Sequence, residues 1–118
     1  YHDLEDFDRD GARDLLLVDS SFARIAWNDG RGGFHVDAAA LPGLLGNPSG
    51  RPGVGDLDGD GDADIVLANG RILWNMGARR FAAGPLAFPS AGGSASILLA
   101  DLDGDADLDL FVSPKVPL

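Results

Sequence analysis

The residues of this chain that are best suited to chemistry are aspartates that recur with one spacing. Three segments of the 118-residue sequence read Asp-x-Asp-x-Asp, and they begin at Asp6, Asp56 and Asp101. Each segment carries a further Asp at its ninth position and then enters a short apolar stretch. Because so many like charges in nine residues repel one another, a folded loop of this kind needs a compensating cation or a very wet surface. The spacing therefore predicts binding of a hard cation.

Calcium suits the spacing best. It takes about six to eight oxygen ligands, and a glycine at position 6 lets positions 1, 3, 5 and 9 and the carbonyl of position 7 converge. Magnesium is less suitable, because it prefers an octahedral shell rich in water. With up to three calcium ions, the predicted ligands are Asp6, Asp8, Asp10, the carbonyl of Ala12 and Asp14; Asp56, Asp58, Asp60, the carbonyl of Asp62 and Asp64; and Asp101, Asp103, Asp105, the carbonyl of Asp107 and Asp109.

The three loops are not equivalent. In the third, Ala106 stands where the first two have glycine, and a positive φ there would cost roughly 1 kcal/mol or more. We expect this loop to be the weakest or a distorted site. The first loop contains Arg9 and Arg13, which are expected to offset two of its four carboxylates and to lower its affinity.

Two other interpretations of the loops are open. Asp and Gly dominate ordinary solvated turns, but three copies in phase, each followed by an apolar run, favour a binding site. An EF-hand loop begins in the same way. It requires Glu at position 12, where this chain has Leu17, Leu67 and Val112, and its flanks are helices.

A second motif follows the first two loops in the same register. It reads Trp-Asn-x-Gly and leads to a Phe, and its copies lie 47 residues apart. Two motifs with one period near 50 residues indicate a repeated unit of about four strands. The motif residues are Trp27, Asn28, Gly30 and Phe34, then Trp74, Asn75, Gly77 and Phe81.

The second repeat shows where such strands should lie. A segment ending at Val54 precedes the loop, Ile65 to Ala68 is apolar, and Asn69-Gly70 predicts a two-residue hairpin turn before a strand from Arg71 to Trp74. A fourth strand is expected near Phe81. We predict an all-β fragment of a longer propeller, with about two and a half four-stranded antiparallel blades in an incomplete ring. Its parts are blade 1 (1–37, with a short inner strand), a connector (38–50), blade 2 (51–83), a connector (84–94) and the first hairpin of blade 3 (95–118).

On these residues the chain resembles the FG-GAP and VCBS-type calcium-binding repeats of the integrin α-subunit β-propeller and of many secreted bacterial proteins. Residues 28–44 look especially like the bacterial ASPIC-type variant. The resemblance implies a propeller with calcium held between the first two strands of each blade, and a cell-adhesion or other interaction role. Arg13, Ala106 and the missing Phe-Gly and Gly-Ala-Pro motifs distance the chain from integrins.

Composition excludes several classes of partner and binding site. The formal charge of −10 argues against a nucleic-acid partner, while 45% hydrophobic residues indicate a folded chain. No apolar run is long enough for a membrane span, and the absence of cysteine excludes disulfides and thiolate sites. Fourteen of the nineteen acidic residues lie in the three loops, so the remainder is nearly neutral.

No residue pattern indicates catalysis. His2 and His35 are isolated, and no serine lies in a Gly-x-Ser-x-Gly motif. We therefore expect a non-enzymatic, extracellular, periplasmic or cell-surface module that has a structural role and binds another protein or a glycan. The alternative is that the segment is the scaffold or substrate-binding part of a larger secreted enzyme, such as a polysaccharide lyase or hydrolase.

Overall fold

The computed structural model describes residues 2–19, 22–37, 40–41, 50–86, 95–100 and 109–114. All regular structure in these ranges is β. The same ranges contain no helix long and apolar enough to cross a membrane. The predicted all-β fold is confirmed. The strands are β1 (His2–Glu5), β2 (Asp14–Val18), β3 (Ala23–Asn28), β4 (Phe34–Asp37), β5 (Gly50–Arg51), β6 (Gly53–Gly55), β7 (Asp64–Val66), β8 (Arg71–Asn75), β9 (Phe81–Leu86), β10 (Ala95–Ala100) and β11 (Asp109–Pro114).

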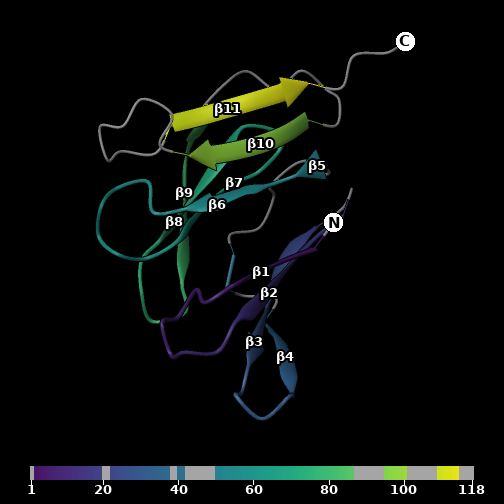
Figure 1. Ribbon diagram of the computed structural model, residues 1–118, viewed down its shortest axis with the longest axis vertical. Coiled ribbons are helices and arrows are strands. Elements are labelled where there is room, and N and C mark those ends of the chain that lie inside the picture. The colour runs from purple at the N-terminus through teal and green to yellow at the C-terminus, as the bar shows by residue number, and fades with distance from the viewer. Residues whose placement is uncertain are drawn as a thin grey trace.

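The strands form two four-stranded antiparallel sheets and one smaller sheet (Figure 1). Strands β1 to β4 follow one another across the first sheet, here blade 1, and β6 to β9 do the same in the second, here blade 2. The third sheet has the order β11-β10-β5. Such up-and-down antiparallel sheets, joined in sequence without closing into a barrel, are the arrangement expected of a propeller segment.

The short strand β5 pairs with a strand that is far from it in the sequence. Gly50 and Arg51 pair in parallel with Ala95 and Ser96 of β10, although they immediately precede blade 2. Pro52 separates β5 from β6, and proline has no N–H to donate to a ladder. The pairing places the chain in two sheets within four residues, which the local sequence did not predict.

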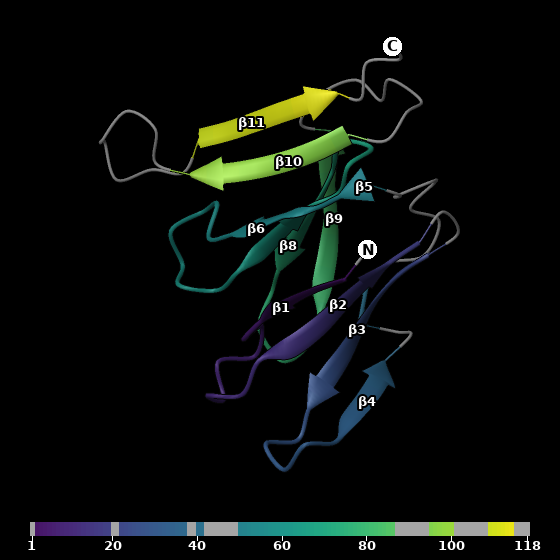
Figure 2. The same ribbon diagram turned by 45° about the vertical axis from the view of Figure 1, so that its right-hand side comes forward.

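Blade 2 lies between blade 1 and the β10–β11 hairpin in both views (Figures 1 and 2). Blade 2 thus has neighbours on both sides, and the second strands of the two blades differ in burial accordingly. In β2, buried and partly exposed residues alternate, as in a strand with one covered face. In blade 2, all four residues from Ile65 to Ala68 are buried. A continuous apolar run is typical of a strand covered on both faces.

The core fills the space between the two blades. The first blade contributes side chains from β2 and β3, the second from β7, β8 and β9, and Ala40 and Leu41 add a piece of the connection. Phe7, from the first Asp loop, packs edge-on against Phe81 with ring centroids 5.8 Å apart. The core residues are Phe7, Leu16, Val18, Ala23, Ile25, Trp27, Ala40, Leu41, Ile65, Leu67, Leu73 and Phe81.

The hairpin between β7 and β8 differs from the predicted two-residue turn. Gly70 N–H donates to the carbonyl of Leu67, and Leu67 N–H donates to the carbonyl of Arg71, so three residues form the loop. Gly70 has φ +92°, whereas Asn69 is not among the residues with positive φ. A two-residue Asn-Gly turn would need positive φ at both positions. The turn therefore closes one residue earlier, with Ala68 and Asn69 at its centre.

Corresponding residues of the two blades have different exposure. Phe34 begins β4 and is 49% exposed, while Phe81 begins β9 and is 8% exposed because it faces Phe7 of the preceding blade. The same sequence position is thus a core residue in one repeat and a surface residue in the other.

This difference predicts unequal responses to one substitution. Phe81→Ala should lower the free energy of unfolding by about 3 kcal/mol, since it leaves a cavity between the blades. Phe34→Ala, the matched control, should change it by less than about 1 kcal/mol. Urea unfolding followed by tryptophan fluorescence measures both, and Phe81→Leu provides a milder variant if the alanine variant does not fold. Equal losses at the two positions would contradict the interblade packing.

Candidate metal centres

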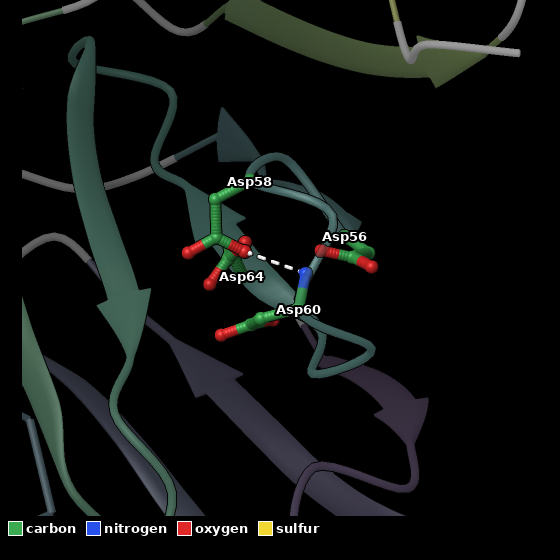
Figure 3. A group of neighbouring side chains, drawn as sticks. All are labelled: Asp56, Asp58, Asp60 and Asp64. Carbon is green, nitrogen blue, oxygen red and sulfur yellow. Dashed lines mark hydrogen bonds between the residues drawn. The ribbon is translucent and has the colours of Figure 1, made fainter.

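The loop between β6 and β7 gathers four aspartates. Asp56, Asp58, Asp60 and Asp64 each bring a carboxylate oxygen within 4.8 Å of the others. Figure 3 shows the four side chains around the loop, with the bond from Asp60 N–H to Asp58 Oδ1 drawn as a dashed line. Asp64 is fully buried at the base of the group, whereas Asp58 and Asp60 are exposed. All four predicted carboxylate ligands of this loop therefore lie together.

The loop between β1 and β2 gathers three of its four. Asp6, Asp8 and Asp14 approach within the same 4.8 Å, and Asp10 is not part of the group. Asp10 Oδ1 accepts the N–H of Ala12 at 2.9 Å, but this bond does not explain its separation from the group. The corresponding bond in the second loop, from Asp62 N–H to Asp60 Oδ1, is also 2.9 Å long. The predicted ligand role of the Ala12 and Asp62 carbonyls stays a prediction.

The third loop lies outside the described residues. This applies to Asp101, Asp103, Asp105 and Asp107, and also to Ala106, so the predicted third site stays a prediction. Asp109 starts β11, where its backbone pairs with Ala100.

The aspartate at position 1 closes the first and the second loop by accepting backbone N–H bonds. Asp56 accepts the N–H groups of Gly59 at 2.9 Å and Gly61 at 2.8 Å. In the first loop, Asp6 accepts those of Asp10 and Gly11, at 3.1 and 2.9 Å. The glycines at position 6 have φ near +90° in both loops, which a residue with a Cβ adopts only with strain. The glycine predicted to allow a sharp turn at position 6 thus has the positive φ that such a turn needs.

The aspartate at position 9 binds two strands and the loop together. Asp64 accepts the N–H of Leu57 at 2.9 Å and that of Asn75 at 2.8 Å. Asp14 makes the same pair of bonds with Phe7 and Asn28, at 3.0 and 2.9 Å. Both carboxylates are fully buried. A buried charge needs such donors, so this residue is structural as well as a possible ligand.

The Asn of the Trp-Asn-x-Gly motif completes this arrangement. The Asn28 amide donates to the Arg13 carbonyl at 2.9 Å, and the Asn75 amide donates to the Ala63 carbonyl at 3.1 Å. These carbonyls belong to position 8 of the Asp loops. The motif is evident in the sequence, but its hydrogen bond to the loop is not. The signal for this attachment in the sequence is that the motif and the loop occur together in two repeats.

Of the two arginines that the sequence predicts to offset the carboxylates of the first loop, Arg9 instead pairs with the second loop, and the effect of Arg13 stays a prediction. Arg9 Nη1 lies 3.5 Å from Asp62 Oδ1 of the second loop and close to Gly61. Arg9 has a backbone φ of +59°, and the corresponding position of the second loop is a glycine. The charge of Arg9 therefore acts on the neighbouring blade.

The electrostatics of both loops favour an added cation. Burial, followed by the charge of Asp14, raises the pKa of Asp8 to about 6. Burial also raises the pKa values of Asp14, Asp58 and Asp64. Backbone N–H donors lower the pKa values of Asp10 and Asp56. Burial therefore disfavours the charged form at Asp8 and Asp14 of the first cluster and at Asp58 and Asp64 of the second.

The donor set fits a hard divalent cation. Each cluster offers carboxylate oxygens alone, at separations that one ion can bridge. Asp56, Asp58, Asp60 and Asp64 would hold an ion in the second loop, and Asp6, Asp8 and Asp14 in the first. Such an ion would stabilise the charged form of the carboxylates whose pKa values burial raises.

The two roles of aspartate can be separated by isosteric substitution. In chelator, Asp64→Asn should lower the free energy of unfolding by at least about 2 kcal/mol, because the amide retains only one acceptor for two buried N–H groups. The matched Asp60→Asn should change it by no more than about 0.5 kcal/mol. Both should weaken cation binding. Chemical denaturation in chelator makes the comparison, and similar stabilities of the two variants would refute a structural role for position 9.

The raised pKa of Asp8 predicts a pH dependence. The folded state holds this proton more tightly than the unfolded state, so its stabilising contribution is complete below about pH 4 and is lost as the pH rises through about 6. In chelator, the Asp8 carboxyl carbon should titrate near pH 6 by NMR. Added calcium should move the titration to lower pH, because the ion binds the ionised form. Titration near pH 4 in chelator would contradict the burial of Asp8.

One comparison with known proteins identifies the family of the chain. The sequence profile of the FG-GAP-like repeat family matches residues 6–67 and 68–112, and thus nearly the whole chain. No curated protein and no solved structure matches the chain. The first match begins at the first aspartate of the first loop, and the two matches together include all three loops. The chain belongs to the FG-GAP-like repeat family.

Proposed function

We propose that this segment is a calcium-stabilised repeat module with a structural and interaction role in an extracytoplasmic protein. The observation that supports calcium most directly is the convergence of Asp56, Asp58, Asp60 and Asp64 within 4.8 Å. Family membership supports a repeat module in which blades pack in series.

The ligand chemistry favours calcium over other common ions. Zinc prefers nitrogen and sulfur ligands, and both described clusters consist of carboxylates. Magnesium retains several waters and uses few carboxylates, whereas calcium accepts a flexible cage of about six to eight oxygens. A loop with four converging carboxylates and a further predicted carbonyl suits the larger ion.

The expected affinity argues for a location outside the cytoplasm. Extracellular calcium modules have dissociation constants of about 0.1 to 1 mM. At millimolar calcium, a site at about 0.1 mM contributes about 1.4 kcal/mol to the stability of the fold. Cytosolic calcium would leave such sites empty. The module would then present the surfaces of its blades to a protein or a glycan.

Calcium should therefore stabilise the chain. The melting midpoint in 1 mM calcium should exceed that in chelator by roughly 5 °C or more. The double variant Asp58→Asn/Asp60→Asn should lose most of the contribution of the second loop, and 1 mM magnesium should have a much smaller effect than calcium. Differential scanning calorimetry gives the midpoints. Identical midpoints in calcium and chelator would rule out the proposed role.

A further inference from the structure

Arg79 reaches from one blade into the carboxylate cluster of the other. It lies in the turn between β8 and β9 of blade 2, and both its Nε and Nη2 approach Asp8 Oδ2 to 3.0 Å. Asp8 belongs to the first cluster with Asp6 and Asp14. The Asp8 side chain is 10% exposed and that of Arg79 50%, so the charged bond forms at the edge of the interface between blades.

The guanidinium group is held on a second side by an aromatic ring. Its Cζ lies 5.0 Å from the centroid of the Trp27 ring, which is a cation–π distance. Trp27 is buried, at 3% exposure, in the core of blade 1. The backbone of Arg79 has φ +60°, an unfavourable value for a residue with a side chain. Gly77 and Ala78 before it also have positive φ, so this conformation belongs to the turn, and the contacts with Asp8 and Trp27 position the side chain.

The second cluster has no comparable contact among the described ion pairs. There, Arg9 approaches Asp62 at 3.5 Å, and Asp62 is not one of the four clustered carboxylates. Arg79 thus engages a clustered carboxylate, while Arg9 engages a neighbour of the cluster. The position in the turn of blade 1 that corresponds to Arg79 is Gly32, so blade 1 has no equivalent side chain.

We propose that Arg79 is an internal cation of the first Asp loop and competes there with a divalent ion. The inference rests on the proposed calcium function and deepens it. Asp8 Oδ2 accepts a hydrogen bond from Arg79 Nε and forms an ion pair with Nη2, so an ion that binds the Asp8 carboxylate must share it with a positive charge or displace the guanidinium. The first site is consequently weaker than the second, and ion binding there releases the guanidinium from Asp8 and alters its contact with Trp27.

Single-site parents test the difference in affinity. Parent A keeps only the first loop and carries D58N, D60N, D103N and D105N. Parent B keeps only the second loop and carries D8N, D10N, D103N and D105N. By calorimetric titration with calcium, Arg79→Gln should tighten binding about three- to tenfold in parent A. It should change binding less than twofold in parent B, and Arg31→Gln should have no effect in either.

A fluorescence measurement in the otherwise intact chain does not depend on the stability of these parents. With Trp74→Phe, Trp27 is the sole tryptophan. Calcium should change its emission as the weaker site fills, and Arg79→Gln should abolish that part of the change.

The outcomes separate the two proposals. Calcium binding that is equally tight with and without Arg79→Gln, with an unchanged Trp27 response, overturns the competition and leaves the calcium function standing. No binding by the intact chain at millimolar calcium overturns both. Tighter binding in parent A alone, with loss of the Trp27 response, supports the competition.

Discussion

The fold depends on a buried carboxylate at the ninth position of the two Asp loops that the structure describes. Asp14 and Asp64 are removed from water, and each is stabilised by backbone N–H groups from its own loop and from the third strand of its blade. The cost of burying the charge is offset only when both donors are in place. The loop, the second strand and the third strand must therefore assemble together, and this common requirement fixes the other aspartates around one point.

The same loops also join the blades. Phe7 of the first loop packs on Phe81, and its carbonyl accepts a 2.9 Å hydrogen bond from the Asn75 amide of blade 2. Asn75 in turn donates its backbone N–H to Asp64. A continuous set of bonds thus runs from one acidic loop to the other. Events that reorganise either loop act directly on the contact between blades.

The sequence predicted the features that rest on local chemistry. Loop spacing, the glycine at position 6 and the apolar runs after each loop identified the blades and the clusters around Asp58 and Asp8. The pairing of β5 with β10 and the three-residue turn at Ala68 depend on distant strands and on register, which local composition does not encode. The partners of Arg9 and Arg79 lie in the other blade, more than 50 residues away in the chain. These contacts form only when the two blades pack together, so the sequence alone does not identify them.

The contrast between Phe34 and Phe81 gives the repeat array a direction. Blade 2 receives blade 1 on the side that contains Phe81, and blade 1 presents its equivalent side, with Phe34, to solvent. The contact joins two different surfaces, so it is heterologous and has no twofold symmetry. One rotation, repeated at every junction, therefore determines whether a series of such units closes into a ring or continues as a spiral. Substitutions at the junction residues would alter that curvature before they altered any single blade.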